Sequence, residues 1–210
     1  MDKSVLALDA LKRKQSIESQ RLSDTAEAMA SRAISKTTIA ASTAIIRLVI
    51  PNKGRGQIAE PAADLRDIRQ DHQLQTAIAN DLRIARAQAE LLIGDALTLG
   101  YRSQVEGTYL PGGKLTLTIT DQDRADLAGY PILGETAAEH AAAIADQLRR
   151  DINRALGMPL TGQADATKIP AALGAVVDAH AKRVSGGVTE AYYAGTQAGV
   201  IAAGAALVGA

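Results

Sequence analysis

The chain of 210 residues contains no cysteine, no phenylalanine and no tryptophan, and its five tyrosines are the only aromatic residues. The absence of cysteine excludes a disulfide scaffold, a zinc site with thiolate ligands and catalysis by a thiol. Without large rings the core must be filled by small and aliphatic side chains, and 42 residues are alanine and 18 are glycine. Such a composition favours helices that meet along alanine and glycine faces. We therefore predict a mainly α-helical, elongated subunit of long helices with a small β-hairpin excursion.

The net charge is zero, but the two signs are divided along the chain. Residues 1–56 hold ten Lys and Arg against five Asp and Glu, and residues 57–210 hold thirteen against eighteen. This division indicates a basic N-terminal arm that could face a polyanion and an acidic body that could face a basic protein. The alternative is that both parts are simply solvated surfaces.

Long hydrophobic runs are also scarce. The N-terminal sequence MDKSVLALDALKRK lacks the uninterrupted apolar core and the small-residue cleavage site of a secretory signal, so we do not expect secretion. The longest apolar stretch, residues 198–210, is shorter than the ~20 residues that cross a bilayer. We expect a packed terminal helix and no membrane partner, with a membrane-active tail as the alternative.

Residues 1–50 contain neither proline nor glycine. Leu22, Ala26, Met29 and Ala33 follow helical spacing, so we predict one long N-terminal helical arm over residues 1–50. The arm should end before Pro51, because proline disfavours helical conformation in the residue that precedes it. Residues 51–61 hold two prolines and two glycines and are predicted to form a linker.

A heptad pattern predicts a second long helix over residues 62–100. Three of its apolar positions, Ile78, Leu82 and Leu92, are predicted interface residues. The spacing of four and three residues makes a packing seam that faces either the first helix or a second copy of itself. The seam comprises Ile78, Leu82, Ala85, Ala89, Leu92, Ala96 and Leu99.

The segment 101–135 is predicted to hold a β-hairpin and a loop. Leu115, Leu117 and Ile119 alternate with threonines, and residues 111–113 (Pro-Gly-Gly) supply a turn just before them. A lone two-stranded hairpin is marginal in water, so it requires a covering helix or strands from neighbouring subunits.

The C-terminal third predicts two further helices. The first, at 136–157, starts with Thr136 and Glu139 in the arrangement of a capping box. A linker at 158–170 follows, and then an Ala/Gly-rich helix at 171–210 with a weak point at Gly186 and Gly187. Small residues recur at every fourth position of this last helix and would let another helix backbone come close, which must offset the cost of glycine in a helix. This ridge comprises Gly187, Ala191, Gly195, Gly199 and Ala203.

Catalytic and metal-binding patterns are not recognisable. His72, His140 and His180 lie far apart, and the spacing of Asp67 and Asp71 among arginines favours surface ion pairs over a cation site. No nucleophile elbow, phosphate-binding loop or dinucleotide fingerprint occurs. We expect no enzyme activity, no cofactor and no metal ion. Phosphate contacts, if the basic arm meets DNA non-specifically, are predicted at Lys12, Arg13, Lys14, Lys53 and Arg55.

Three segments from residue 129 onward resemble the C-terminal part of phage minor head proteins of the Mu F type, the head-morphogenesis family. They are residues 129–134 (GYPILG), 145–156 (ADQLRRDINRAL) and 189–195 (TEAYYAG). Members of the family commonly show an Arg-Thr-Glu element and then Arg-Ala-Tyr-Asn-Ala-Gly in the last helix. Here the matching residues are Ala191, Tyr192, Ala194 and Gly195. The polar positions of the motif are occupied instead by Ser185, Gly187, Glu190 and Tyr193.

The resemblance implies a non-enzymatic, multi-copy virion component, made in the host cytoplasm, that associates with the portal or other head proteins. It implies a role in head assembly and in genome packaging or release, and the ridge and the hairpin favour a ring-like homo-oligomer. Two alternatives stay open: a head-to-tail adaptor or internal ejection protein, and a cellular coiled-coil adaptor. Tyr193 is predicted to be an interface anchor, because tyrosine is favoured at interfaces.

Overall fold

The computed structural model describes residues 3–49, 71–105, 109–110, 113–114, 119–157 and 168–208. This part of the chain is mainly helical, as the composition predicts. In chain order its elements are α1 (Lys3–Ala30), α2 (Ser35–Val49), α4 (His72–Val105), β1 (Tyr109–Leu110), β2 (Gly113–Lys114), α5 (Asp121–Ala128), α6 (Ala137–Leu156) and α8 (Lys168–Val208).

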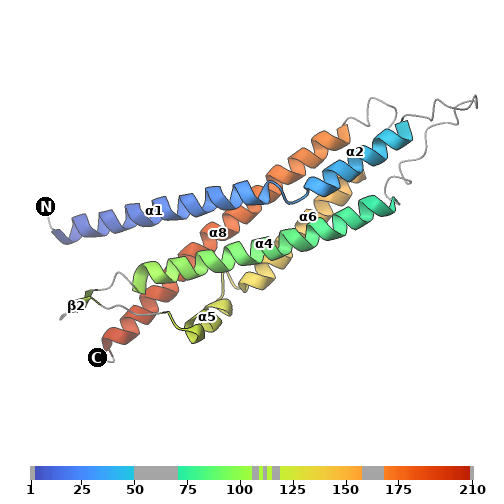
Figure 1. The fold of residues 1–210 in the computed structure, drawn as a ribbon. Coiled ribbons are helices and arrows are strands. Elements are labelled where there is room, and N and C mark those ends of the chain that lie inside the picture. The colour runs from blue at the N-terminus through green and yellow to red at the C-terminus, as the bar shows by residue number, and fades with distance from the viewer. Residues whose placement is uncertain are drawn as a thin grey trace, which may run out of the picture.

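The long helices form an elongated up-down-up-down bundle (Figure 1). The consecutive helices α1 and α2 run in one direction, α4 runs back, α6 runs forward again and α8 returns. The parallel helices α4 and α8 make the most extensive contact, with α1 and α2 packed on one side of this pair and α6 on the other. The N- and C-terminal ends therefore lie at the same end of the bundle.

Glycines bring the backbones of α4 and α8 into direct contact. A Cβ atom added to Gly100 would overlap the carbonyl oxygen of Tyr192, and one added to Gly195 would overlap that of Leu97. A Cβ at Gly199 would lie 2.6 Å from another backbone carbonyl of α4. Backbone atoms cannot move aside as a flexible side chain can. The close partner that the ridge requires is therefore α4 of the same chain.

Two hydrophobic clusters follow each other along the bundle. The first joins α2, α4, α6 and α8 and contains the seam residues Ile78 and Leu82. The second joins α1, α4, α5, α6 and α8, and half-buried Leu92 packs against it. The seam thus packs within the subunit. The largest buried side chains of the two clusters are Ile34, Leu74, Ile93, Leu97, Ile132, Leu148, Ile152, Ile169, Leu173 and Tyr192.

Polar contacts attach α1 to α8. The hydroxyl of Tyr192 donates to Oε2 of Glu18 over 3.0 Å, and the hydroxyls of Ser23 and Ser185 form a short hydrogen bond. Tyr192 is buried, and burial is the largest cause that raises its pKa to about 12. The phenol therefore stays a neutral donor at neutral pH.

The N-terminal arm is not one helix, because residues 31–34 form a turn between α1 and α2. The buried carboxylate of Asp81 accepts hydrogen bonds from the backbone N–H and the hydroxyl of Thr37, at 2.8 and 2.9 Å. Asp81 thereby satisfies an amide that the first turn of α2 leaves without a helical partner. The single-helix prediction was wrong because this capping group comes from α4 and leaves no local signal.

The boundaries of the other elements differ in part from the predictions. The capping box of Thr136 and Glu139 is present, and α6 starts directly after Thr136. Within the segment predicted as a hairpin and a loop, residues 121–128 form α5, which has its own capping box made by Thr120 and Asp123. Helix α8 continues without a break through Gly186 and Gly187, where the weak point is predicted. The reason is that Gly187 is buried beneath His140 of α6.

Several predicted features lie wholly or partly outside the described residues. These are the linker 51–61, residues 62–70 of the seam helix, and residues 158–167 of the second linker, whose last three residues belong to α8. Strands β1 and β2 pair antiparallel, with Tyr109 opposite Lys114 and Leu110 opposite Gly113. Residues 115–118, on which the alternating pattern rests, also lie outside the described residues.

Replacing Gly100 with alanine should destabilise the fold. The added methyl group must push α8 away, and overpacking of this kind costs about 2 to 3 kcal/mol of unfolding free energy. Gly94→Ala is the matched control, because a Cβ there meets no atom within 4 Å and alanine favours the helix by ~1 kcal/mol. Urea unfolding followed by circular dichroism measures both. Equal stability of the two variants would contradict the close contact.

Candidate functional site

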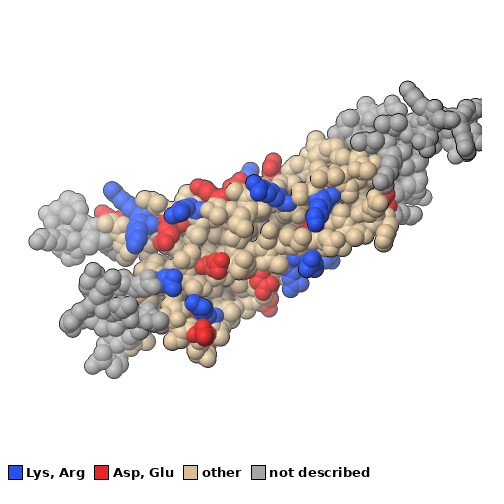
Figure 2. Space-filling model, viewed as in Figure 1, with Lys and Arg blue, Asp and Glu red and all other residues tan. Residues whose placement is uncertain are grey.

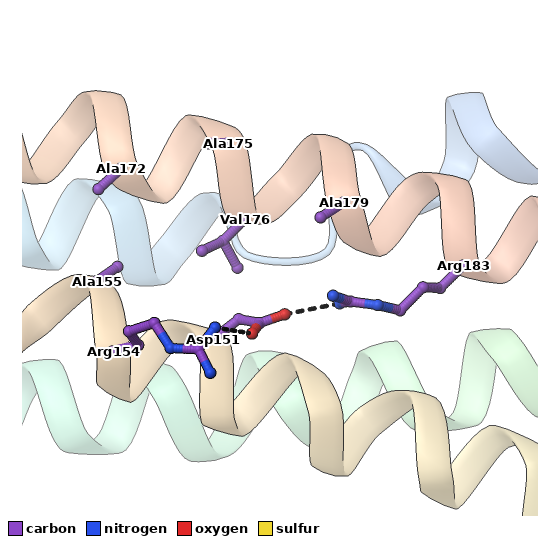
Figure 3. A pocket seen from close by; sticks show the side chains of 8 residues that line it. All are labelled: Asp151, Arg154, Ala155, Ala172, Ala175, Val176, Ala179 and Arg183. Atoms are coloured by element: carbon purple, nitrogen blue, oxygen red, sulfur yellow. Dashed lines mark hydrogen bonds and ion pairs between the residues drawn. The ribbon is translucent and has the colours of Figure 1, made fainter.

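A hollow lies between α6 and α8 (Figure 3). Its volume is about 340 Å³. Ala172, Val176 and Ala179 of α8 point toward α6, and Ala155 of α6 points back (Figure 3). The space exists because α8 presents alanine at positions where longer side chains would reach α6. The lining residues are Asp151, Arg154, Ala155, Ala172, Ala175, Val176, Ala179 and Arg183.

One end of this hollow is formed by a charged group around Asp151. Its Oδ2 lies 2.7 Å from Nη1 of Arg183, an ion pair without hydrogen-bond geometry. Its Oδ1 accepts a hydrogen bond from Gln147 over 2.9 Å and lies 3.4 Å from Nη1 of Arg154. Asp151 is buried, whereas Arg154 is exposed. The group therefore joins α6 to α8 and presents guanidinium edges at the rim.

A second charged group lies farther along the same two helices. Nδ1 of His140 is 3.4 Å from Oε2 of Glu135, and its Nε2 is 3.6 Å from Oε2 of Glu190. The imidazole covers Gly187, where an added Cβ would lie 3.0 Å from Nε2. His140 thus links the loop before α6 to the surface of α8.

His180 is the buried titratable group of this region. It is 1% exposed, and its Nδ1 atom has no hydrogen-bond partner among the described residues. Burial, and after it the guanidinium of Arg183, lowers the pKa of His180 to about 4. The imidazole is neutral at neutral pH and shielded from solvent, so a proton cannot be exchanged readily with a substrate.

The two adjacent tyrosines of α8 have opposite environments. Tyr192 is buried, whereas Tyr193 is 46% exposed, and their rings meet edge to face with centroids 5.8 Å apart. Farther along α8, Val200 and Ile201 are 57% and 66% exposed. Other helices also expose large apolar side chains, such as Ile17 of α1 and Leu91 of α4. Of the predicted interface residues, Tyr193 is the one that faces solvent, while Gly187, Ala191, Gly195 and Gly199 are buried within the subunit.

The predicted phosphate-binding residues are not gathered on one face. Lys12, Arg13 and Lys14 are exposed on α1, where consecutive residues diverge by 100° around the helix. Lys53 and Arg55 lie outside the described residues. Figure 2 shows lysine and arginine interspersed with aspartate and glutamate on the visible face. A groove for a polyanion is not visible on that face.

A second hollow, of about 540 Å³, lies between α4 and α5. Arg102 and Arg124 stand at its edge with Asp95, and Leu97 and Leu127 line its apolar part. Nη1 of Arg124 is 3.9 Å from Oδ1 of Asp121. Side chains of both signs line this hollow, and Arg124 is already paired with Asp121. The hollow therefore shows no clear preference for binding a cation or an anion.

Within the described ranges, no group of three or more histidine, aspartate or glutamate side chains is arranged to hold a metal ion. None of the helices in those ranges is long and apolar enough to cross a membrane. The titratable groups around the α6–α8 hollow are paired with one another or buried. This arrangement can bind a side chain or position a helix.

Two features of this site were missed in the sequence. Asp151 directly precedes Ile152, which is buried in α6, and Asp81 directly precedes Leu82 of the seam. A charged residue next to a buried apolar position was the signal available in the sequence. The partners, Arg183 and Thr37, come from other helices and leave no local pattern. The hollow itself could not be inferred from the spacing of alanines alone.

Acidification should weaken the fold through His180. In the unfolded chain the imidazole of His180 takes up a proton as the pH falls below its ordinary pKa of about 6.5. In the folded chain it takes up this proton only near pH 4. Unfolding therefore becomes more favourable as the pH falls from 6.5 to 4. The loss should reach about 3 kcal/mol at pH 4. Urea unfolding from pH 7 to pH 4 should show a smaller loss for His180→Leu than for the unaltered chain. Exposed His72→Gln is the control, and equal pH slopes for His180→Leu and the unaltered chain would contradict the prediction.

The surface features of the described residues are the two hollows and the exposed side chains of the helices. The most distinctive is the outer side of α8 with the adjoining α6–α8 hollow. Comparison with known protein families, curated proteins and solved structures finds no match for this chain.

Proposed function

We propose that the chain is a non-enzymatic structural protein of a phage particle. It would be a multi-copy minor component of the head or portal vertex that supports head assembly and genome packaging or release. Its partners would be the portal or other head proteins, and it would be made in the host cytoplasm and carried in the virion.

The observation that carries this proposal is the proximity of the segments in which the resemblance lies. The segment 129–134 leads into Glu135, which pairs with His140, and His140 also meets Glu190 of the segment 189–195. Ile132 and Tyr192, one from each segment, are buried in the same hydrophobic cluster. Segments distant in the sequence thus form one unit of structure, which supports a resemblance at the level of a domain.

The surface of α8 supports a role in assembly. Solvent-exposed Tyr193, Val200 and Ile201 on one helix offer apolar area that a neighbouring subunit would cover. The β-hairpin between α4 and α5 belongs to the proposal as a further contact with neighbouring subunits. The proposal also includes a ring of copies. The glycine ridge does not support the ring, because α4 of the same chain covers it.

The alternatives differ in what they require of the surface. A cellular coiled-coil adaptor would use the seam, but Ile78 and Leu82 are buried inside the described bundle. This burial disfavours the adaptor. A head-to-tail adaptor or an ejection protein would use the same outer surfaces as a minor head protein, and it is distinguished by its partner.

Native mass spectrometry of the protein with a candidate portal ring tests the proposal. We expect a ring-sized complex at low salt. If the basic arm makes the contact, raising the salt should dissociate the complex, because screening weakens exposed charge pairs. Absence of a complex at both salt concentrations would contradict the portal assignment.

A matched pair of charge variants locates the contact. The triple change Lys12→Gln, Arg13→Gln and Lys14→Gln should reduce portal binding if α1 makes the contact. The double change Arg149→Gln and Arg150→Gln, on the exposed side of α6, should leave binding unchanged. The opposite ranking would place the contact on α6.

A further inference from the structure

The outer side of α8 carries a stripe of residues spaced by seven: Ala172, Ala179, Gly186, Tyr193 and Val200. Residues seven apart lie on one face of a helix. Gly186, Tyr193 and Val200 are exposed, and Ala172 and Ala179 are half-buried at the α6–α8 hollow. We call these five residues the outer stripe. Its N-terminal members are small and its C-terminal members are large, with glycine between them.

The order of sizes along the outer stripe favours an antiparallel pair of α8 helices. When two copies cross at Gly186, Tyr193 of one copy lies level with Ala179 of the other, and Val200 lies level with Ala172. Each large side chain then meets a small one, which is what close packing of helices requires. In a parallel pair, Tyr193 would meet Tyr193 and the alanines would face each other across a void.

The α6–α8 hollow is the receiving site for the exposed tyrosine. It flanks the level of Ala179, has a volume of about 340 Å³, and is lined on α8 by four apolar residues and Arg183. Figure 3 shows the space between the two helices, with Asp151, Arg154 and Arg183 at one end. The guanidinium groups there are paired with Asp151. An aromatic ring fits between the apolar walls, and its face and hydroxyl can meet the guanidinium groups, because a tyrosine ring attracts cations and its hydroxyl accepts hydrogen bonds.

The centre of the outer stripe is open to a second helix. A Cβ added to Gly186 would meet no atom of the subunit within 4 Å. Nothing in the described part of the subunit occupies the space above this glycine. Another helix can therefore approach the backbone of α8 closely at this point.

The charges on α8 favour the same antiparallel register. Lys182 lies four residues before Gly186 and Glu190 lies four residues after it. In the antiparallel pair Lys182 of one copy is level with Glu190 of the other, whereas a parallel pair would set like charges level. Residues 191–210 carry no charged side chain at all. The C-terminal half of α8 therefore meets its partner without repulsion.

We propose that two copies of this chain pack through antiparallel α8 helices that cross at Gly186, with Tyr193 of each copy seated in the α6–α8 hollow of the other. The contact is isologous, since the same surface serves both copies, and it closes at two copies. It goes beyond the proposed role in the virion and does not depend on it. A dimer without affinity for a portal would leave this inference intact.

Single cysteines test the crossing point, because the chain has none of its own. Under mild oxidation at micromolar concentration, Gly186→Cys should form a disulfide-linked dimer, since the two residues face each other across the twofold axis. Gly174→Cys is the matched control, because Gly174 is an equally open and exposed glycine of α8 that lies off the outer stripe. We expect at least a tenfold greater cross-linked fraction for Gly186→Cys. Equal cross-linking of both variants would overturn the proposal.

A mixed pair tests the direction of the two helices. Val200→Cys mixed with Ala172→Cys should give the linked heterodimer, and Val200→Cys alone should give little linked product. A parallel pair would reverse this result, because it sets Val200 beside Val200. Efficient cross-linking of Val200→Cys alone would therefore overturn the antiparallel arrangement.

Sedimentation equilibrium of the unaltered chain and two truncated variants tests the anchor. Tyr193→Ala should raise the dimer dissociation constant at least tenfold while the circular dichroism spectrum of the monomer stays the same. Leu91→Ala removes an exposed large apolar side chain of α4 and is the control that should leave the dissociation constant unchanged. A chain that is monomeric at tens of micromolar, or equal weakening by the two variants, would overturn the proposal.

Discussion

The rest of the structure depends on the direct backbone contact between α4 and α8. Gly100 on one helix and Gly195 and Gly199 on the other leave no room for a Cβ atom. The short distance between the two helices narrows the bundle, so the grooves on either side can be filled by alanine, leucine and isoleucine. The contact suits a sequence without phenylalanine or tryptophan, and Tyr192 is the one tyrosine buried in the described core. The glycines lower helix propensity, and the packing that they permit offsets that cost.

The buried polar groups act on helix position. Asp81 of α4 caps α2 through Thr37, and Asp151 of α6 pairs with Arg183 of α8. A buried ion pair contributes little net stability, because desolvation opposes the attraction, but leaving one partner alone is costly. Each pair therefore disfavours sliding of one helix along another. His180, neutral and buried, belongs to the same structural set.

The internal use of the seam and the ridge changes which surface is available for partners. Both patterns predict contact surfaces, and both are covered inside the bundle by helices of the same chain. The outer side of α8 is among the surfaces that remain exposed, and there Tyr193 faces solvent while Tyr192 is buried. The α6–α8 hollow lies on this side, and the segments that resemble phage head proteins meet nearby. Assembly through this face is compatible with a virion role and does not require one.

The sequence by itself determined the helical class, the capping box that starts α6, and a packing seam at Ile78 and Leu82 whose partner it left open. These features depend on local composition and on the spacing of apolar residues, which a sequence displays directly. Only the tertiary structure decided the break between α1 and α2, the continuity of α8 through Gly187, and the partners of Asp81 and Asp151. Those outcomes depend on groups from helices that are distant in the sequence. Whether a small-residue ridge faces another subunit or the same chain is decided by which helix lies closest, and no local pattern contains that information.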